Sequence, residues 1–128
     1  MQPIQLFNLA SRQAEWLSVR QEVVAGNIAN STTPNFKSKD VTPFEAVLDQ
    51  THVPMARTNP AHFASNDLSE DIDIKDSELN NEIGIQESGN TVSLSQELSK
   101  TGEIKRQYEL STGLVKSFHS MMLLTVKR

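Results

Sequence analysis

Two long stretches of helical periodicity, one toward each end of the chain, constrain the fold more than any other feature. Within residues 3–30, seam positions recur at alternating steps of three and four residues, and six of the seven are apolar. They are Phe7, Ala10, Ala14, Leu17, Gln21, Val24 and Ile28. This spacing is typical of a coiled-coil seam, so the sequence predicts a long helix that packs along this face.

Residues 93–128 carry a second seam of the same kind. Five of its six positions are apolar, and the six are Ile104, Tyr108, Ser111, Val115, Phe118 and Met122. Ser93 is followed three residues later by Gln96, which is the arrangement of a helix capping box. We therefore expect a second long helix that pairs with the first as an antiparallel coiled coil.

Each predicted helix also has a second apolar stripe on a different face. These stripes consist of Leu9, Trp16 and Val23 in the first helix, and of Leu110, Leu114, Met121 and Leu124 in the second. A helix that is apolar on two faces has neighbours on two sides. Pairing of the two helices would therefore leave one stripe on each of them to be covered by something else.

The middle of the chain, residues 31–92, is polar and rich in loop-forming residues. Thr42 and Pro43 precede the stretch FEAVLDQ, which predicts a short helix with Thr42 as N-cap and Pro43 at its first position. Residues 64–92 contain eight acidic residues and one basic residue, a charge of −7, and are expected to form an exposed loop or hairpin. The predicted fold class is mainly α, with residues 1–128 as a single domain.

The composition excludes several classes of function. The chain has no cysteine, so it has no disulfide, no thiolate nucleophile and no cysteine-based zinc site. A net charge of −4 argues against nucleic acid as a partner. No apolar run approaches the roughly 18 residues of a transmembrane helix, and the N-terminal residues lack the pattern of a secretory signal peptide. Taken alone, these observations suggest the cytoplasm.

The acidic segment contains one candidate calcium site. Asp71, Asp73 and Glu82 fall at positions 1, 3 and 12 of an EF-hand-like loop. However, Lys75 occupies position 5, and Asp76 occupies position 6, where the turn requires glycine. A calcium-binding module is therefore only a minor alternative to a solvated loop.

No motif indicates catalysis, a cofactor or another metal. The three histidines, His52, His62 and His119, are scattered and form no zinc-binding pair. Nucleophile elbows, phosphate-binding loops and dinucleotide fingerprints are likewise missing from the sequence. We predict a protein without enzyme activity, metal or cofactor.

The first helix breaks abruptly at NIANSTTPNF, residues 27–36. We expect Asn30 to end the helix in a left-handed conformation and to bond its own backbone. Pro34 keeps Thr33 extended, so the helix cannot continue. Phe36 is then free to pack against the helix pair.

These ten residues resemble the Asn-Ile-Ala-Asn-x-x-Thr-Pro-Gly-aromatic signature of the flagellar basal-body rod proteins. The matching positions are Asn27, Ile28, Ala29, Asn30, Thr33, Pro34 and Phe36. Thr32 stands where the family commonly has Asp, and Asn35 stands where it usually has Gly. Because asparagine tolerates positive φ better than other non-glycine residues, we expect the turn to form.

The resemblance extends over both ends and much of the middle of the chain, but not over the acidic segment. Three further stretches are similar to segments of the family, and within it most of all to the proximal rod protein: NFKSKDVTPFEAVL, RTNPAHF and GNTVSLSQEL. The resemblance implies a structural subunit of the rod, whose terminal helices pair and present their second stripes to other subunits.

The resemblance also implies the partners and the location of the protein. The expected partners are copies of itself, other rod proteins, ring-adjacent and export-gate proteins, and the flagellar type III export apparatus. Export without a cleaved signal peptide would place the protein in the periplasmic rod. Two alternatives remain: another rod protein, or a cytoplasmic helical adaptor or secretion chaperone that dimerises through the same seams.

Overall fold

The computed structural model describes residues 3–49, 59, 61, 72–77 and 86–127. Within these described residues, five elements follow one another: α1 (Pro3–Ala29), β1 (Lys39–Val41), α2 (Phe44–Asp49), β2 (Ile74–Asp76) and α3 (Leu94–Val126). The two long helices lie where the apolar periodicity predicts them.

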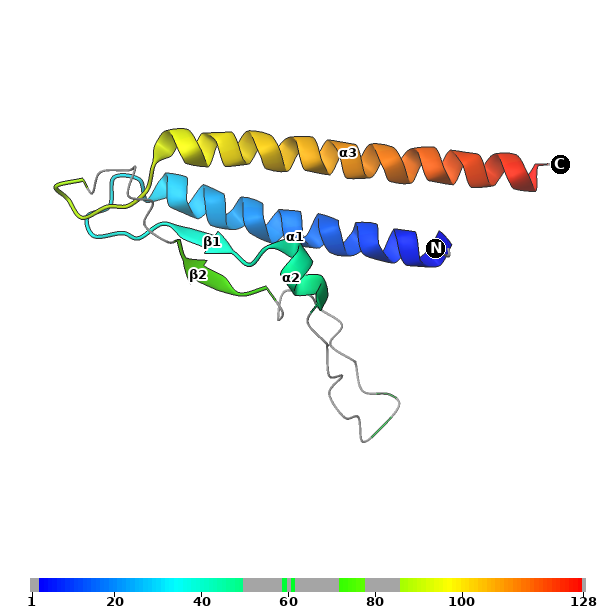
Figure 1. Ribbon diagram of the computed structural model, residues 1–128, viewed down its shortest axis with the longest axis horizontal. Helices are drawn as coiled ribbons and strands as arrows, with labels where there is room; N and C mark the ends of the chain where they lie inside the picture. Colours follow the sequence, from blue (N-terminus) through cyan, green and yellow to red (C-terminus); the bar gives the residue numbers. More distant parts are fainter. Residues whose placement is uncertain (1–2, 50–58, 60, 62–71, 78–85, 128) are drawn as a thin grey trace.

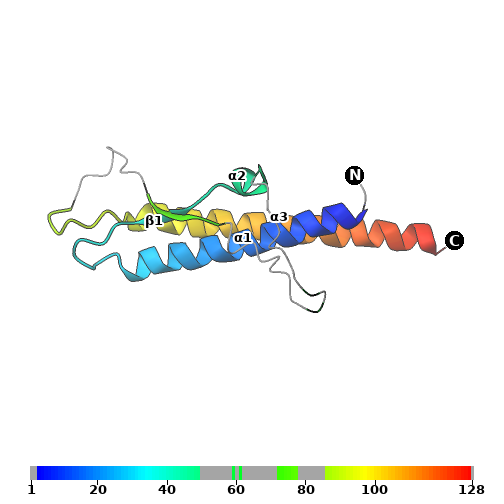
Figure 2. The same ribbon diagram turned by 90° about the horizontal axis from the view of Figure 1, so that it is seen from below.

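The helices α1 and α3 run side by side in opposite directions (Figures 1 and 2). Toward one end of the pair, the rings of Phe7 and Phe118 meet edge to face, with centroids 5.9 Å apart. Toward the other end, Leu17 and Val24 of α1 and Ile104 of α3 are buried. The prediction of a mainly helical fold with paired terminal helices is confirmed.

A small antiparallel strand pair lies along α1 on the side away from α3 (Figure 1). Val41 of β1 is opposite Ile74 of β2, and the Thr42 amide donates to the Asp73 carbonyl at 3.0 Å. The hairpin that the sequence allowed is therefore present. Only β2 comes from the acidic segment, whereas β1 follows the turn after α1.

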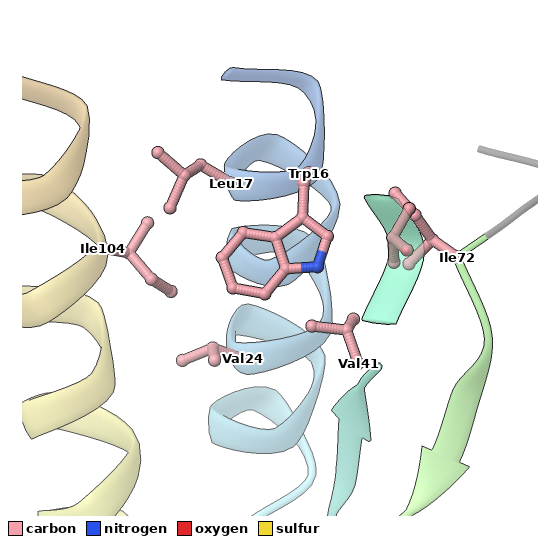
Figure 3. Packing of buried hydrophobic residues seen from close by; sticks show 7 residues of the cluster. Trp16, Leu17, Val24, Val41, Ile72 and Ile104 are labelled. Carbon is pink, nitrogen blue, oxygen red and sulfur yellow. The ribbon is translucent and has the colours of Figure 1, made fainter. Parts of the chain in front are cut away.

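The core of the protein lies between α3, α1 and this strand layer (Figure 3). Its buried members are Trp16, Leu17, Val24, Val41, Val47, Ile72 and Ile104. The Trp16 indole N–H donates to the Thr42 carbonyl at 2.8 Å, and its ring packs against Phe44 with centroids 5.8 Å apart. The Arg20 guanidinium lies over the Trp16 ring, 5.3 Å from its centroid.

Two details of the predicted helix starts differ from the structure. α2 begins at Phe44, and the Thr42 hydroxyl donates to the Asp73 carbonyl at 3.0 Å instead of capping the helix. Ser93 does occupy the N-cap position of α3, but its side chain makes no capping hydrogen bond and lies 3.3 Å from the Ser95 hydroxyl. In both places, the hydroxyl that the sequence predicts as a helix cap interacts with another group instead.

The acidic segment is less uniformly exposed than its charge suggests. Ile72, in its first half, belongs to the buried core, and β2 just after it is exposed. Asn90 and Val92, at its end, are also buried. The charge of this segment therefore does not predict that a few of its side chains pack against the rest of the molecule.

Candidate functional site

The signature turn starts where α1 ends, and Asn30 ends the helix by a different means from the one predicted. Its side-chain Nδ2 donates to the Gly26 carbonyl at 2.8 Å, and its side-chain Oδ1 accepts the Thr33 hydroxyl at 3.2 Å. Asn35, and not Asn30, is the one non-glycine residue with positive φ among those described. The left-handed conformation predicted for Asn30 is therefore wrong, because its side chain already satisfies a carbonyl of the last helical turn.

Asn35 adopts the left-handed conformation that a glycine would normally supply. Its φ is 59°, and its backbone N–H donates to the Ser88 carbonyl at 2.9 Å. Gly89 lies directly against it with a φ of 73°, and a Cβ atom added there would be 2.5 Å from the Asn35 Oδ1. The expectation that asparagine supports this turn is confirmed, and Gly89 leaves the space that it needs.

Asn90, in the segment that leads into α3, holds the turn by hydrogen bonds. Its buried side-chain amide donates to the carbonyls of Asn30 at 2.9 Å, Ser31 at 3.0 Å and Thr33 at 2.8 Å. Its own oxygen accepts the Val92 amide at 2.7 Å. The segment that leads into α3 thereby fixes the path of the chain that leaves α1.

Asn27 joins the last turn of α1 to β1 and to α3. Its side chain is buried, accepts the Lys39 amide at 2.9 Å and donates to the Lys39 carbonyl at 2.7 Å, as a neighbouring strand would. It also donates to Glu97 Oε2 at 3.1 Å. Lys100 pairs with the other oxygen of Glu97 at 3.2 Å and with Asp40 at 3.2 Å.

The remaining signature residues differ in exposure. Phe36 is half-buried and packs on α1 beside Val23 and Gly26, in a groove of about 310 Å³ on the outer side of that helix. The residues that line this groove come from α1, the turn, β1 and β2, and none of them comes from α3. Among the other four, Ile28 is half-buried, and Ala29, Thr33 and Pro34 are exposed.

The seam residues lie along the junction of the two long helices. Leu17, Val24 and Ile104 are buried there, and the small side chains of Ala10 and Ala14 leave a hollow of about 260 Å³. This hollow is also lined by Phe7, Tyr108 and Val115. Phe118 and Met122, beyond it, are half-buried. Tyr108 is largely exposed at the rim, because its neighbours across the junction are small.

The two second stripes, predicted to face other subunits, differ from each other. Trp16 is only 7% exposed, and Val23 packs against the core, so both are covered within the chain by the strand layer. The prediction that they are buried only against other subunits is therefore wrong. Leu9 is half-buried. The stripe of α3 is open, with exposed fractions of 65% for Leu110, 62% for Leu114, 56% for Met121 and 73% for Leu124.

Sequence reasoning missed the two residues that tie this site together, Asn90 and Glu97. Both lie in the stretch GNTVSLSQEL, and no role was assigned to either. The available signal was weak, because an asparagine after glycine indicates only a turn and a glutamate in the first turn of a helix is ordinary. Their partners lie 57 to 70 residues away in the chain.

The described residues contain no cluster of three or more metal-binding side chains. Among these same residues, no helix is long and apolar enough to cross a membrane, and no buried side-chain polar atom is left without a partner. Asp71 and Glu82 of the candidate calcium loop, and the histidines His52 and His62, lie outside the described residues. The site is thus a set of hydrogen bonds that shape a turn, and an open apolar helix face lies farther along α3. That combination defines the class of helical-hairpin structural subunits.

Comparison with known proteins identifies the family. The chain is 69% identical over 130 residues to the flagellar basal body rod protein FlgB of Agrobacterium fabrum, covering 100% of this chain and 97% of that protein. The same protein of Borrelia hermsii is 33% identical over 115 residues, with 84% of each chain covered, and that of Aeromonas hydrophila is 31% identical over 113 residues, with 86% and 83% covered. No family model matches the chain.

The chain belongs to the family of the flagellar basal body rod protein FlgB. It is a structural protein of the proximal basal-body rod and not an enzyme. The alternatives of another rod protein and of a cytoplasmic adaptor or chaperone are set aside by this finding, as is the cytoplasmic location that the composition alone suggested.

Proposed function

We propose that the protein builds the rod through the open apolar stripe of α3, which contacts copies of the same chain and other rod proteins in the tubular shaft that transmits torque. The observation that carries this proposal is the exposure of Leu110, Leu114, Met121 and Leu124. Their spacing of four, seven and three residues places them on one face of the helix.

The open stripe is unfavourable for a chain that stays alone in water. Fully burying an aliphatic side chain contributes about 1.5–3 kcal/mol, and monomeric proteins rarely expose such side chains in one contiguous patch. Three more apolar residues, Leu98, Leu123 and Val126, are at least half-exposed on other faces of α3. Burial of the open stripe against other subunits would therefore provide much of the driving force for assembly.

A charge within the stripe tests the proposal. We expect Leu114→Asp and Met121→Asp to abolish swimming and to leave basal bodies without complete rods, because a carboxylate buried in an apolar contact is strongly unfavourable. His119→Asp is the matched control, since His119 is exposed on a different face of the same helix. Electron microscopy of basal bodies and immunoblots of protein level are the measurements. Normal rods in both stripe variants would refute the proposal.

The same proposal includes contacts with ring-adjacent and export-gate proteins, and passage through the flagellar type III export apparatus without a cleaved signal peptide to the periplasmic rod. Membership of the rod protein family supports these partners. A photoreactive amino acid at position 124 should cross-link in cells to the same chain or to another rod protein, and one at position 119 should do so far less. Equal yields at both positions would count against the assigned face.

A further inference from the structure

Over much of its length, the contact between α1 and α3 does little to fix the register of one helix against the other. Opposite Tyr108 and Val115 lie the small residues Ala10 and Ala14, and the junction there contains a hollow of about 260 Å³. Register in a helix pair depends on large side chains that fit into defined holes of the partner helix. Because the apolar positions repeat every three and four residues, a shift of α3 by one turn would bring similar residues together.

A buried polar cluster lies at the other end of the same contact. The Glu97 side chain is 3% exposed and accepts hydrogen bonds from Asn27 of α1 at 3.1 Å and from Lys100 at 3.2 Å. Asn27 is in turn held by both backbone groups of Lys39, and Lys100 reaches Asp40. A single carboxylate therefore links α1, β1 and α3.

This cluster distinguishes one register from its neighbours far more strongly than the apolar seam does. A slip of one turn would move Glu97 by about 5.4 Å along the helix axis, beyond reach of the Asn27 amide. A buried carboxylate is tolerated only when it is paired and hydrogen-bonded, so each slipped register would carry a large penalty. In the native register the cost of burial offsets the gain from pairing, and the cluster contributes specificity more than stability.

We propose that Glu97 is a positioning residue that fixes the register of α3 against α1. It thereby fixes where the open stripe of α3 stands relative to the signature turn, to which Asn27 belongs. The inference concerns the folded subunit itself, so it does not depend on the contact proposed for that stripe.

The test measures register as a distance between two spin labels. The chain contains no cysteine, so Ala25→Cys on α1 and His119→Cys on α3, both at exposed positions, give two unique labelling sites. Pulsed electron paramagnetic resonance on the full-length protein should show one distance. In Glu97→Met we expect a second population displaced by about 5.4 Å, one helical turn. The ratio of native to displaced populations should fall about tenfold, the factor that corresponds to about 1.4 kcal/mol.

Two matched variants separate register from general loss of charge. Glu97→Gln keeps an oxygen that can accept from Asn27, and it should show the native distance alone. Glu103→Met removes the half-exposed partner of Arg20, an ion pair of 3.7 Å across the same two helices, and it should also show only the native distance. A displaced population in either control would overturn the proposal.

A single native distance in Glu97→Met would overturn it as well. If that variant loses its helical circular dichroism, Glu97→Ala removes the same carboxylate without added bulk and repeats the measurement. Loss of helical signal in both variants would show that the carboxylate is required for folding itself, and that outcome too would refute a role in register.

Discussion

Similar apolar patterns are buried at one end of the helix pair and exposed at the other. The closed end comprises residues 16–49, 72–77 and 86–104, which include most of α1, the signature turn, β1, α2, β2 and the start of α3. It contains every buried side chain of the described residues. The open end comprises α1 before Trp16 and α3 after Ile104. Its main contact inside the subunit is the edge-to-face pair of Phe7 and Phe118.

The difference arises from where the chain goes after α1. The turn directs it back along α1, so that β1 and α2 cover the stripe containing Trp16 and Val23. No described element packs against the stripe of α3, which keeps the exposure of Leu114 and Leu124 high. The closed end thus makes a folded subunit, and the open end leaves apolar surface for assembly.

The largest expected effect lies at the centre of the closed end. Trp16→Ala removes a buried ring, its hydrogen bond to Thr42 and its contact with Phe44. We expect the free energy of unfolding to fall by about 3–5 kcal/mol, as for other buried aromatic side chains. Urea denaturation followed by circular dichroism measures this, and a loss below about 1 kcal/mol would mean that the closed end is not the stable core.

A smaller loss is expected when the turn loses its donor. Asn90→Ala leaves the carbonyls of Asn30, Ser31 and Thr33 without the amide that serves all three. The buried Val92 amide also loses its acceptor, so the expected cost is about 1–3 kcal/mol, the penalty for a buried polar group left unpaired. Asn8→Ala, at an exposed position of α1, is the control in the same urea titration. Equal midpoints for the two variants would contradict the role assigned to Asn90.

The conformation of Asn35 gives a third comparison within the closed end. Asn35→Val places a β-branched residue at a φ of 59° and should cost about 1–2 kcal/mol. Asn35→Gly, which restores the residue usual in the family, should differ from the wild type by only about 0.5 kcal/mol. Thermal unfolding of the three proteins side by side checks this order. A valine variant as stable as the glycine variant would show that the turn relaxes.

The smallest effect on stability is expected at the open end. Leu114→Ala removes an exposed side chain, so the unfolding free energy of the isolated chain should change by no more than about 0.5 kcal/mol. Rod assembly in cells should nevertheless weaken, because the residue belongs to the proposed contact. If Leu114→Ala destabilised the isolated chain as much as Trp16→Ala does, the contrast between the two ends would be lost.

Much of the local structure could be predicted from the sequence. The bounds of α1 and α3 follow from periodicity that extends over many turns, and the break after Ala29 follows from Pro34. The backbone of Asn35 was also predictable, because few residue types accept positive φ. The hydrogen-bond partners of individual side chains could not be predicted, as Asn30 and Thr42 show.

Local sequence patterns are enough to predict two long helices, each apolar on two faces, with a sharp stop after the first. Periodicity and backbone sterics are local, so they can be read without knowing what lies nearby in space. Which second stripe is covered, and which distant residues Asn90 and Glu97 bind, depends on how the whole chain packs. Two apolar stripes look alike in sequence, and a polar side chain does not encode which distant group will satisfy it. Burial and hydrogen bonding are settled only when the whole chain is folded.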